Sequence, residues 1–146
     1  MSKIMALDLG DAWIGIAVTD ITGTFARPVT TVATKDINSV LAKLVSDEKI
    51  KTVIVGYPRT MKGGESDQTR KIIAQKERLA QTFPEQEFIL WDERLSSQRA
   101  QALAPKKKSP EEKLKEHARA AAFILDSYTT FLRARKDQEA KEVDKL

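Results

Sequence analysis

The stretch Asp8-Leu9-Gly10-Asp11-Ala12-Trp13-Ile14-Gly15-Ile16-Ala17-Val18 decides the fold of this chain. An apolar run from Ile4 to Leu7 precedes it, and Ile14, Ile16 and Val18 alternate with smaller residues, the two-residue period of a pleated strand. The pattern predicts two antiparallel strands joined by a tight turn. Asp8 stands where the first strand ends, a position suited to chemistry. Taken alone, the motif also fits an ordinary hairpin whose aspartate bonds its own backbone.

Length and composition indicate one globular domain. The chain has 146 residues, 41% hydrophobic and 32% charged, enough to bury a core. No apolar stretch approaches the roughly 20 residues that cross a bilayer, and no signal peptide fits before the first strand, so we expect no membrane partner. The absence of cysteine excludes disulfides and thiolate metal sites and favours a cytoplasmic location. The net charge of +4 is mild, so its distribution matters more than its total.

Strand-like and helix-like segments alternate along the rest of the chain. Pro28–Ala33 is rich in β-branched residues and predicts an edge strand, since proline lacks the backbone donor. The apolar spacing from Ile37 to Val45 predicts an amphipathic helix capped by Thr34 or Asp36. The next expected elements are a strand over 51–56, a helix carrying Ile72 to Phe83, a strand over 88–91, a short helix over 96–103 and a long helix from Ser109.

The long helix has clear start signals. Ser109 fits the N-cap, Pro110 the first helical position and Glu112 a capping box. Its predicted apolar stripe comprises Leu114, Ala118, Ala121, Leu125, Tyr128 and Leu132. From Arg133 onward we expect frayed helix or disorder, and we divide the chain into one domain over residues 1–135 and a charged tail over 136–146.

The order of these elements predicts an α/β fold, a five-stranded mixed sheet with helices on both faces. The three leading strands form an antiparallel meander, and right-handed crossovers make the two later strands parallel to the first. Parallel strands bring their carboxyl ends to one edge of the sheet. We therefore expect Asp8, Gly56-Tyr57-Pro58 and Trp91-Asp92-Glu93 at that edge.

Asp8 and Glu93 are candidates for a metal site at this edge. Two adjacent carboxylates repel each other unless a cation lies between them, and hard oxygen ligands suit Mg²⁺ or Mn²⁺. The alternative for Glu93 is a solvated ion pair with Arg94 or Arg99. His117, the only histidine, lies at the edge of the apolar stripe. It is either a satisfied core residue or an imidazole carried to the same edge as a metal ligand or general base.

Four blocks resemble the YqgF/RuvX family of pre-16S rRNA nucleases, relatives of Holliday-junction resolvases with a ribonuclease H-like fold. The resemblance extends from Lys3 to about Leu132. Its blocks are Asp8-Leu9-Gly10 with Ile14 to Asp20, Val53 to Pro58 continuing through Met61 and Gly63 to Gln68, Asp92-Glu93-Arg94-Leu95-Ser96, and His117 to Leu125 with Ser127-Tyr128.

The resemblance implies metal-dependent hydrolysis of phosphodiester bonds, with Asp8, Glu93 and His117 holding two divalent ions, Mg²⁺ or Mn²⁺. It implies precursor ribosomal RNA as the substrate and ribosome biogenesis as the setting. The chain departs from the family pattern at His117, where aspartate is usual. It also departs at Asp11-Ala12-Trp13, which lacks a common basic residue.

Several further residues are candidates for contacts with nucleic acid. Basic side chains in loops expected near the catalytic edge could contact phosphates or simply form a soluble surface. Trp13 could stack on a nucleobase or pack against its loop. Arg94 could contact phosphate or orient a neighbouring carboxylate, and we favour the second role. The basic loop residues are Arg59, Lys62, Lys106, Lys107 and Lys108.

Competing interpretations remain open at this stage. A Holliday-junction resolvase acting on branched DNA needs the same metal centre as an RNA nuclease. A non-catalytic, RNA-binding ribosome-assembly factor would keep the fold without the metals. An actin-like nucleotide-binding module opens with a similar hairpin but needs two such halves. A monomer suits RNA trimming and a homodimer suits a junction with two-fold symmetry.

Overall fold

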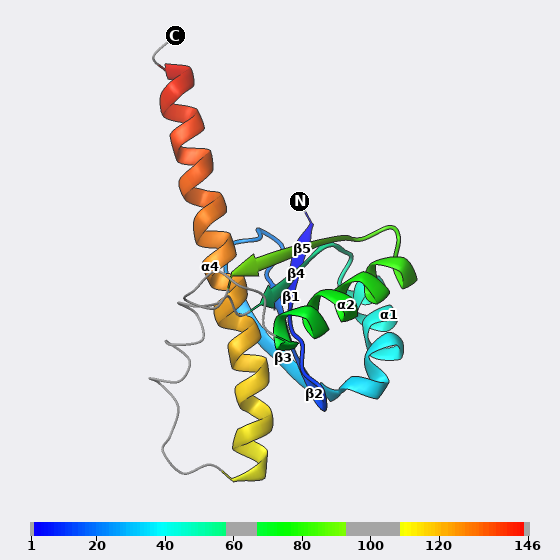
Figure 1. Cartoon of the computed structure of the whole chain (residues 1–146). Helices are drawn as coiled ribbons and strands as arrows, with labels where there is room; N and C mark the ends of the chain where they lie inside the picture. The colour runs from blue at the N-terminus through cyan, green and yellow to red at the C-terminus, as the bar shows by residue number, and fades with distance from the viewer. Residues whose placement is uncertain (1, 58–66, 93–108, 145–146) are drawn as a thin grey trace.

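The structure is a computed structural model that describes residues 2–57, 67–92 and 109–144 (Figure 1). Five strands form one sheet in the order β3-β2-β1-β4-β5. The first three are antiparallel neighbours, and β4 and β5 run parallel to β1, which confirms the predicted α/β class and mixed sheet. The strands are β1 (Lys3–Asp8), β2 (Trp13–Thr19), β3 (Ala26–Ala33), β4 (Ile50–Tyr57) and β5 (Glu87–Asp92).

The strands are slightly longer than the sequence predicts. β3 begins at Ala26 rather than Pro28, because Ala26 continues the ladder opposite Thr19. β4 and β5 each gain one residue at both ends through the same kind of pairing. β3 is an edge strand, as its proline predicts.

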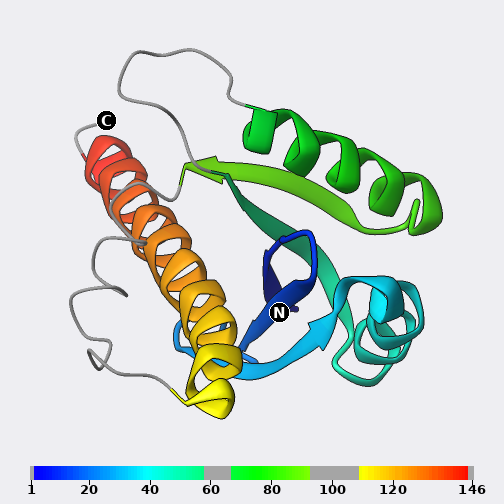
Figure 2. The same ribbon diagram turned by 60° about the horizontal axis from the view of Figure 1, so that its bottom comes forward.

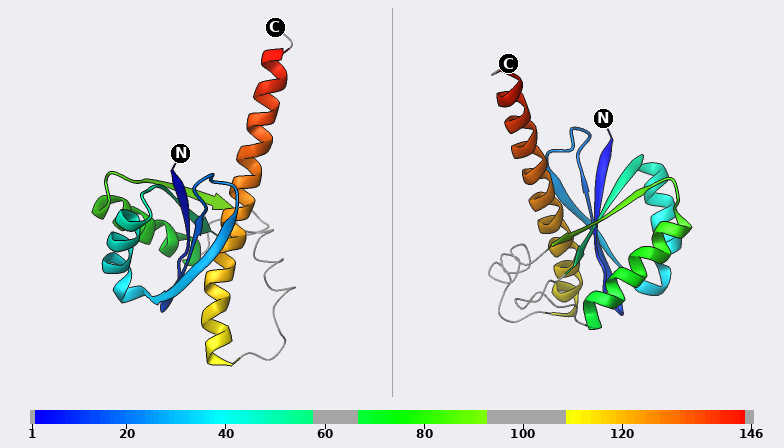
Figure 3. Two further views of the ribbon diagram at one scale, coloured as in Figure 1. Left: turned by 180° about the vertical axis from the view of Figure 1, so that it is seen from behind. Right: turned by 45° about the horizontal axis from the view of Figure 1, so that its top comes forward.

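Helices cover both faces of the sheet (Figures 2 and 3). The 3₁₀ helix η1 (Thr34–Asp36), α1 (Ile37–Asp47) and α2 (Asp67–Thr82) lie on one face, and α4 (Pro110–Asp144) lies on the other. The helix expected over 96–103 falls outside the described residues. Asp36 occupies the N-cap position of α1, but its side chain makes no capping hydrogen bond. None of the described helices has the length and hydropathy to cross a bilayer.

Because side chains alternate between the two faces along each strand, a separate hydrophobic core lies on each face of the sheet. Met5, Leu7 and Leu9 pack with α1 and α2 in the larger core. Ala6 packs with α4 in the smaller core, together with Ala17, Ile54, Ala121, Ile124 and Leu125. Because successive side chains point to opposite faces, Asp8 shares the α4 face with Ala6. The first strand therefore presents its carboxylate beneath the last helix.

The long helix begins as predicted and continues farther than predicted. The Glu112 backbone N–H donates to Ser109 Oγ over 3.2 Å, so Ser109 caps the helix and Pro110 is its first residue. α4 continues without a break through the segment expected to fray or become disordered and ends at Asp144. Figure 1 shows this exposed part projecting past the sheet. The division of the chain at residues 135/136 stays a prediction.

α4 lies across one row of cross-strand neighbours. The register aligns Thr31 on β3 with Gly15 on β2, and Gly15 with Asp8 on β1. The same row continues through Gly56 on β4 to Trp91 on β5, since Leu7 is level with Val55 and Gly56 is level with Trp91. The helix backbone meets Gly15, so the helix crosses the strands at the level of Asp8.

Contacts at both ends of this row hold the helix in place. The Thr31 hydroxyl donates to the Leu114 carbonyl, and Trp91 Nε1 donates to Ser127 Oγ over 3.2 Å. Leu114 and Ser127 are separated by roughly 20 Å of helix at 1.5 Å per residue. Four strand spacings of about 4.8 Å give roughly 19 Å. The two lengths match, so the helix spans the sheet without needing to bend.

Gly15 sets how closely the helix approaches the sheet. A Cβ atom at Gly15 would lie 1.9 Å from the His117 carbonyl oxygen and 2.8 Å from the Ala118 nitrogen. Both neighbours are backbone atoms, which cannot rotate away. A glycine in a strand is typical of such a close backbone approach. The missing side chain of Gly15 is therefore what allows His117 to reach the row that contains Asp8.

We predict that Gly15→Ala loses about 2–4 kcal/mol of unfolding free energy, because the added methyl must push α4 off the sheet. Urea unfolding followed by circular dichroism measures this loss. Gly23→Asn is the matched control: Gly23 has φ 72° and open space around its Cβ position, and asparagine tolerates that backbone conformation. A Gly15→Ala protein as stable as the Gly23→Asn protein would contradict the prediction.

Candidate functional site

Asp8 and His117 meet on the α4 side of the sheet. The distance from Asp8 Oδ2 to His117 Nδ1 is 3.7 Å. The side chains are 22% and 39% exposed, so the pair is partly shielded yet accessible from solvent. Asp8 is placed by the end of β1, and His117 is placed by the contact of its own backbone with Gly15. Two of the three residues predicted as metal ligands therefore lie side by side.

The carboxylate changes the acidity of the imidazole. The Asp8 carboxylate accepts a long hydrogen bond from the His117 imidazole and also attracts its positive charge. Both effects raise the pKa of His117 above its usual 6.5. Partial burial opposes this shift, and Glu116 adds a smaller attraction. At 3.7 Å the contact is an ion pair more than a well-formed hydrogen bond. When His117 is protonated, its imidazolium is the counter-charge to Asp8.

Hydrogen bonds from η1 and α2, on the face of the sheet opposite α4, fix the turn between β1 and β2. Thr34 Oγ1 and Gln75 Nε2 both donate to the Gly10 carbonyl, over 2.8 and 3.3 Å. The Thr34 backbone N–H donates to the Ala12 carbonyl over 2.9 Å. These hydrogen bonds tie the turn that follows Asp8 to η1 and α2.

Asp11 in this turn has a cationic partner. Lys71 Nζ on α2 lies 3.7 Å from Asp11 Oδ2, and both side chains are exposed. The family pattern places a basic residue in the turn itself, and this sequence lacks one. Here a lysine from a neighbouring helix brings positive charge to the same turn, where it offsets the charge of Asp11.

Trp13 opens β2 at the same edge of the sheet. It is 40% exposed, so a substantial part of its ring faces solvent. Strand alternation puts Trp13 on the α4 face with Gly15. An exposed indole on the same face and at the same edge of the sheet as Asp8 leaves open the predicted stacking on a nucleobase.

The remaining candidate residues lie outside the described residues. They are Glu93, Arg94, Arg59, Lys62, Lys106, Lys107 and Lys108. Asp92, which precedes Glu93, ends β5 level with Tyr57 on β4, at the carboxyl ends of the parallel strands. The predicted role of Glu93 stays a prediction that the position of Asp92 supports.

The described donors fit a small divalent cation only in part. Within residues 2–57, 67–92 and 109–144, no cluster of three or more metal-ligating side chains forms. Asp8 and His117 supply one carboxylate and one imidazole in mutual contact. Carboxylates suit Mg²⁺ and Mn²⁺, and imidazole suits the transition metals among the divalent ions. This donor pair, completed by another carboxylate, suits Mn²⁺ better than Mg²⁺.

Asp20, another acidic residue of the first family block, has a structural role. Its carboxylate accepts from the backbone N–H groups of Thr24 and Phe25 and from the Thr22 hydroxyl. Bonding to the Phe25 and Thr22 donors lowers the pKa of Asp20. It shapes the β2–β3 hairpin, at the opposite end of β2 from Asp8.

Sequence reasoning missed two residues that position the site. Gly15 admits the helix backbone, and its signal is a glycine within an otherwise apolar strand. Trp91 fixes the far half of α4 through Ser127 and packs edge-on against Tyr128 at a centroid distance of 5.2 Å. That second contact has no sequence signal, because it depends on the direction in which α4 crosses the sheet.

Comparison with known proteins gives a consistent set of relatives. A family model described as RuvX, Holliday junction resolvase, matches residues 2–130. A protein of Rubrobacter xylanophilus named "Putative pre-16S rRNA nuclease" is 43% identical over 95 residues, which cover 65% of this chain and 68% of that protein. A Phocaeicola vulgatus protein of the same name is 35% identical over 132 residues, covering 88% of this chain and 95% of its own.

The fold has a solved counterpart. The structure of Thermus thermophilus RuvC in complex with a Holliday junction substrate superimposes with a TM-score of 0.56. It covers 94% of this chain and 97% of its own, at 14% sequence identity. The likeness shows that this chain shares the ribonuclease H-like fold of RuvC.

We predict that the only histidine of the chain titrates above pH 6.5 in metal-free buffer containing EDTA. Its protonation stabilises the folded state fully below about pH 6.5, and this contribution is lost as pH rises through the folded-state pKa. NMR of the single imidazole measures the value. Asp8→Asn should lower it, whereas Asp126→Asn, an exposed change on the same helix as His117, should not. A wild-type pKa at or below 6.5 would contradict the described pairing.

Proposed function

Because this chain belongs to the RuvX family, we propose that it is a divalent-metal-dependent nuclease that processes the 5′ end of precursor 16S rRNA. The observation that carries the proposal is the Asp8–His117 pair, 3.7 Å apart at the edge where the parallel strands end. The names of the relatives support ribosomal RNA as the substrate. Action on ribosomal RNA would take place in the cytoplasm.

Asp8, Glu93 and His117 would hold the metal, as two ions of Mg²⁺ or Mn²⁺. When bound, such ions lower the pKa of a water molecule and neutralise charge that develops on the phosphate. Asp8 contributes hard oxygen ligands that β1 fixes in place. His117 can donate a nitrogen ligand only when its imidazole is neutral, and Asp8 stabilises the protonated form. Metal binding would therefore release a proton from His117.

Residues around the pair would bind and orient the RNA. Trp13 exposes an indole at the same edge of the sheet as Asp8, on which an unpaired base can stack. Lys71, held near the turn by Asp11, lies on α2 where it can attract phosphates. In this proposal, Arg59, Lys62 and Lys106 to Lys108 add further phosphate contacts, and Arg94 orients Glu93.

The second candidate substrate is a four-way DNA junction. The family description and the RuvC complex favour it, because both name Holliday junctions. A junction enzyme suits a homodimer, since its substrate has two-fold symmetry, whereas a monomer suits RNA trimming. Purified protein incubated in parallel with a precursor 16S RNA and a four-way junction separates the two. Sedimentation of the same preparation gives the oligomeric state.

We predict that Asp8→Asn reduces Mn²⁺-dependent cleavage by about three orders of magnitude, since it removes a charged ligand at the reacting centre. Glu93→Gln should have a similar effect. Asp126→Asn, which removes an exposed carboxylate elsewhere on the surface, should keep wild-type activity. Cleavage rates with all three variants make the test. Wild-type rates in Asp8→Asn and Glu93→Gln would show that the site is wrong.

We also predict that Mn²⁺ affinity rises with pH, by up to about tenfold per unit below the folded-state pKa of His117, because binding must displace its proton. Calorimetric titrations at several pH values measure this slope and the protons released. His117→Asn should flatten the dependence. Absence of Mn²⁺ binding near neutral pH would favour the non-catalytic, RNA-binding interpretation instead.

A further inference from the structure

An exposed phenylalanine lies where α4 leaves the sheet. Phe131 is 46% exposed, although its ring also contacts Trp91 at a centroid distance of 5.2 Å and an interplanar angle of 51°. Trp91 packs edge-on against Tyr128 as well, so three aromatic rings form a cluster at the β5 edge of the sheet. The Phe131 ring is thus held by packing while a large part of it stays in contact with solvent.

This aromatic cluster lies on the same face of the sheet as Asp8. Trp91 packs in the smaller core, on the α4 face, and the row of cross-strand neighbours joins Asp8 to Trp91 through Gly56. Two strand spacings of about 4.8 Å put the Cα atoms of Asp8 and Trp91 roughly 10 Å apart. A ligand can therefore extend from Asp8 toward the cluster without crossing the sheet.

One flank of α4, here called the His117 flank, is defined by His117, Phe131 and Arg135. Arg135 follows His117 by about five turns of 3.6 residues, so the two lie on one line along the helix, and Phe131 lies about one turn before Arg135. Figure 1 shows α4 as one uninterrupted helix over this length. At 1.5 Å per residue, Phe131 is roughly 21 Å beyond His117. An aromatic ring followed by a cation, in line with a catalytic centre, is an arrangement that suits a single strand of nucleic acid.

The projecting part of α4 begins with a run of cations. Arg133, Arg135 and Lys136 are exposed, and no carboxylate lies among residues 133–136. Arg135 pairs with Glu139 over 3.5 Å, and the two side chains are 67% and 64% exposed. An exposed pair of this kind contributes little stability, so Arg135 can exchange Glu139 for a phosphate at small cost. The charge next to Phe131 therefore favours a polyanion.

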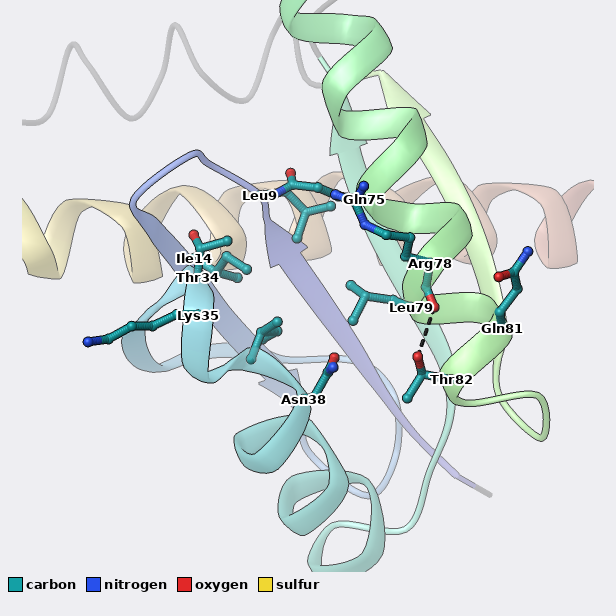
Figure 4. A pocket seen from close by; sticks show the side chains of 11 residues that line it. Leu9, Ile14, Thr34, Lys35, Asn38, Gln75, Arg78, Leu79, Gln81 and Thr82 are labelled. Atoms are coloured by element: carbon teal, nitrogen blue, oxygen red, sulfur yellow. Dashed lines mark hydrogen bonds between the residues drawn. The ribbon is translucent and has the colours of Figure 1, made fainter.

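A pocket on the opposite face of the sheet does not continue this flank. It has a volume of about 470 Å³ and lies beside Leu9, between η1, α1 and α2 (Figure 4). The Lys35 and Gln81 side chains point away from the cavity, and the sheet separates it from the α4 face that carries Asp8. A strand bound at Asp8 therefore has its shorter path along α4.

We infer that the strand cut at Asp8 continues unpaired along the His117 flank, with one base stacked on Phe131 and a phosphate at Arg135. The inference rests on the proposed nuclease function for the identity of the strand. It assigns a single-stranded segment to the substrate on this side of the cut, because a base must leave its duplex stack before a side chain can stack on its face. Phe131 and Arg135 position the substrate and take no part in the reaction.

Binding of a labelled single-stranded RNA oligonucleotide, measured by fluorescence anisotropy in EDTA, tests the stacking contact without any cleavage. Phe131→Leu keeps an apolar contact with Trp91 but removes the ring, and it should weaken binding about tenfold. Phe131→Trp should bind at least as tightly as the wild type. The matched control is Phe25→Leu, which changes a 71% exposed phenylalanine in the β2–β3 hairpin and should alter affinity less than twofold.

The salt dependence of the same binding tests the phosphate contact. Arg135→Gln should reduce the salt slope of the affinity by up to about 0.7, the contribution of one phosphate in a single strand. Arg119→Gln is the matched control, because Arg119 lies on the other flank of α4 and pairs with Glu112 over 3.4 Å in the same exposed manner. It should leave the slope unchanged. A fully paired RNA of the same length should bind more weakly than the single strand and should be insensitive to Phe131→Leu.

Each outcome decides the question. Wild-type affinity in Phe131→Leu, or an equal loss in Phe25→Leu, would overturn the inference. So would a self-association, seen by sedimentation, that Phe131→Leu abolishes while RNA affinity stays unchanged, since the cluster would then be an interface between two copies of this chain. Because the assay contains no metal, its result is independent of cleavage. A protein that binds RNA through Phe131 but cuts neither RNA nor DNA would refute only the nuclease.

Discussion

The architecture depends on one backbone contact, where the α4 helix rests on Gly15. No side chain separates the two elements there, and a single added carbon would meet the His117 carbonyl oxygen at 1.9 Å. The Thr31 and Trp91 contacts keep the helix aligned along the row on either side of this point. The close approach lets an imidazole from the last helix reach a carboxylate from the first strand. The smaller core of Ala6, Ala17 and Ala121 serves the same end, since small side chains let the helix lie low.

Electrostatics explains why the two residues at this edge can coexist without a metal. A partly buried carboxylate is costly unless it has a partner, and His117 supplies one whenever its imidazole is protonated. An aspartate at the histidine position, as is usual in the family, would instead set two negative charges close together. The histidine therefore gives this chain a metal-free state without that repulsion. The consequence is that a proton and a metal cation compete for His117. At a site made of two carboxylates, the same competition would occur at lower pH.

Much of the fold follows from local patterns, and much of the site does not. The meander and the parallel strands were predictable because alternation, turn residues and crossover handedness are short-range rules. The helical state of residues 133–144 was also within reach, since this segment contains neither glycine nor proline and is rich in helix-forming residues. The sequence left two roles open for His117, a satisfied core residue or an imidazole next to Asp8. It could not decide between them because the angle at which a helix crosses a sheet cannot be predicted from local sequence patterns. The pocket beside Leu9 depends on how η1, α1 and α2 diverge, which no motif encodes.

The position of α4 after all five strands in the sequence has a consequence for biosynthesis. Strands β1 to β5 emerge from the ribosome first, and they carry Asp8 but not its partner. The apolar side chains on the α4 face of the sheet stay uncovered until α4 docks, so the smaller core cannot form before then. The pair of Asp8 and His117 therefore first exists when the C-terminal helix docks. A nascent chain is inert at that edge until α4 has emerged, and docking of this helix assembles the smaller core and the site in one step.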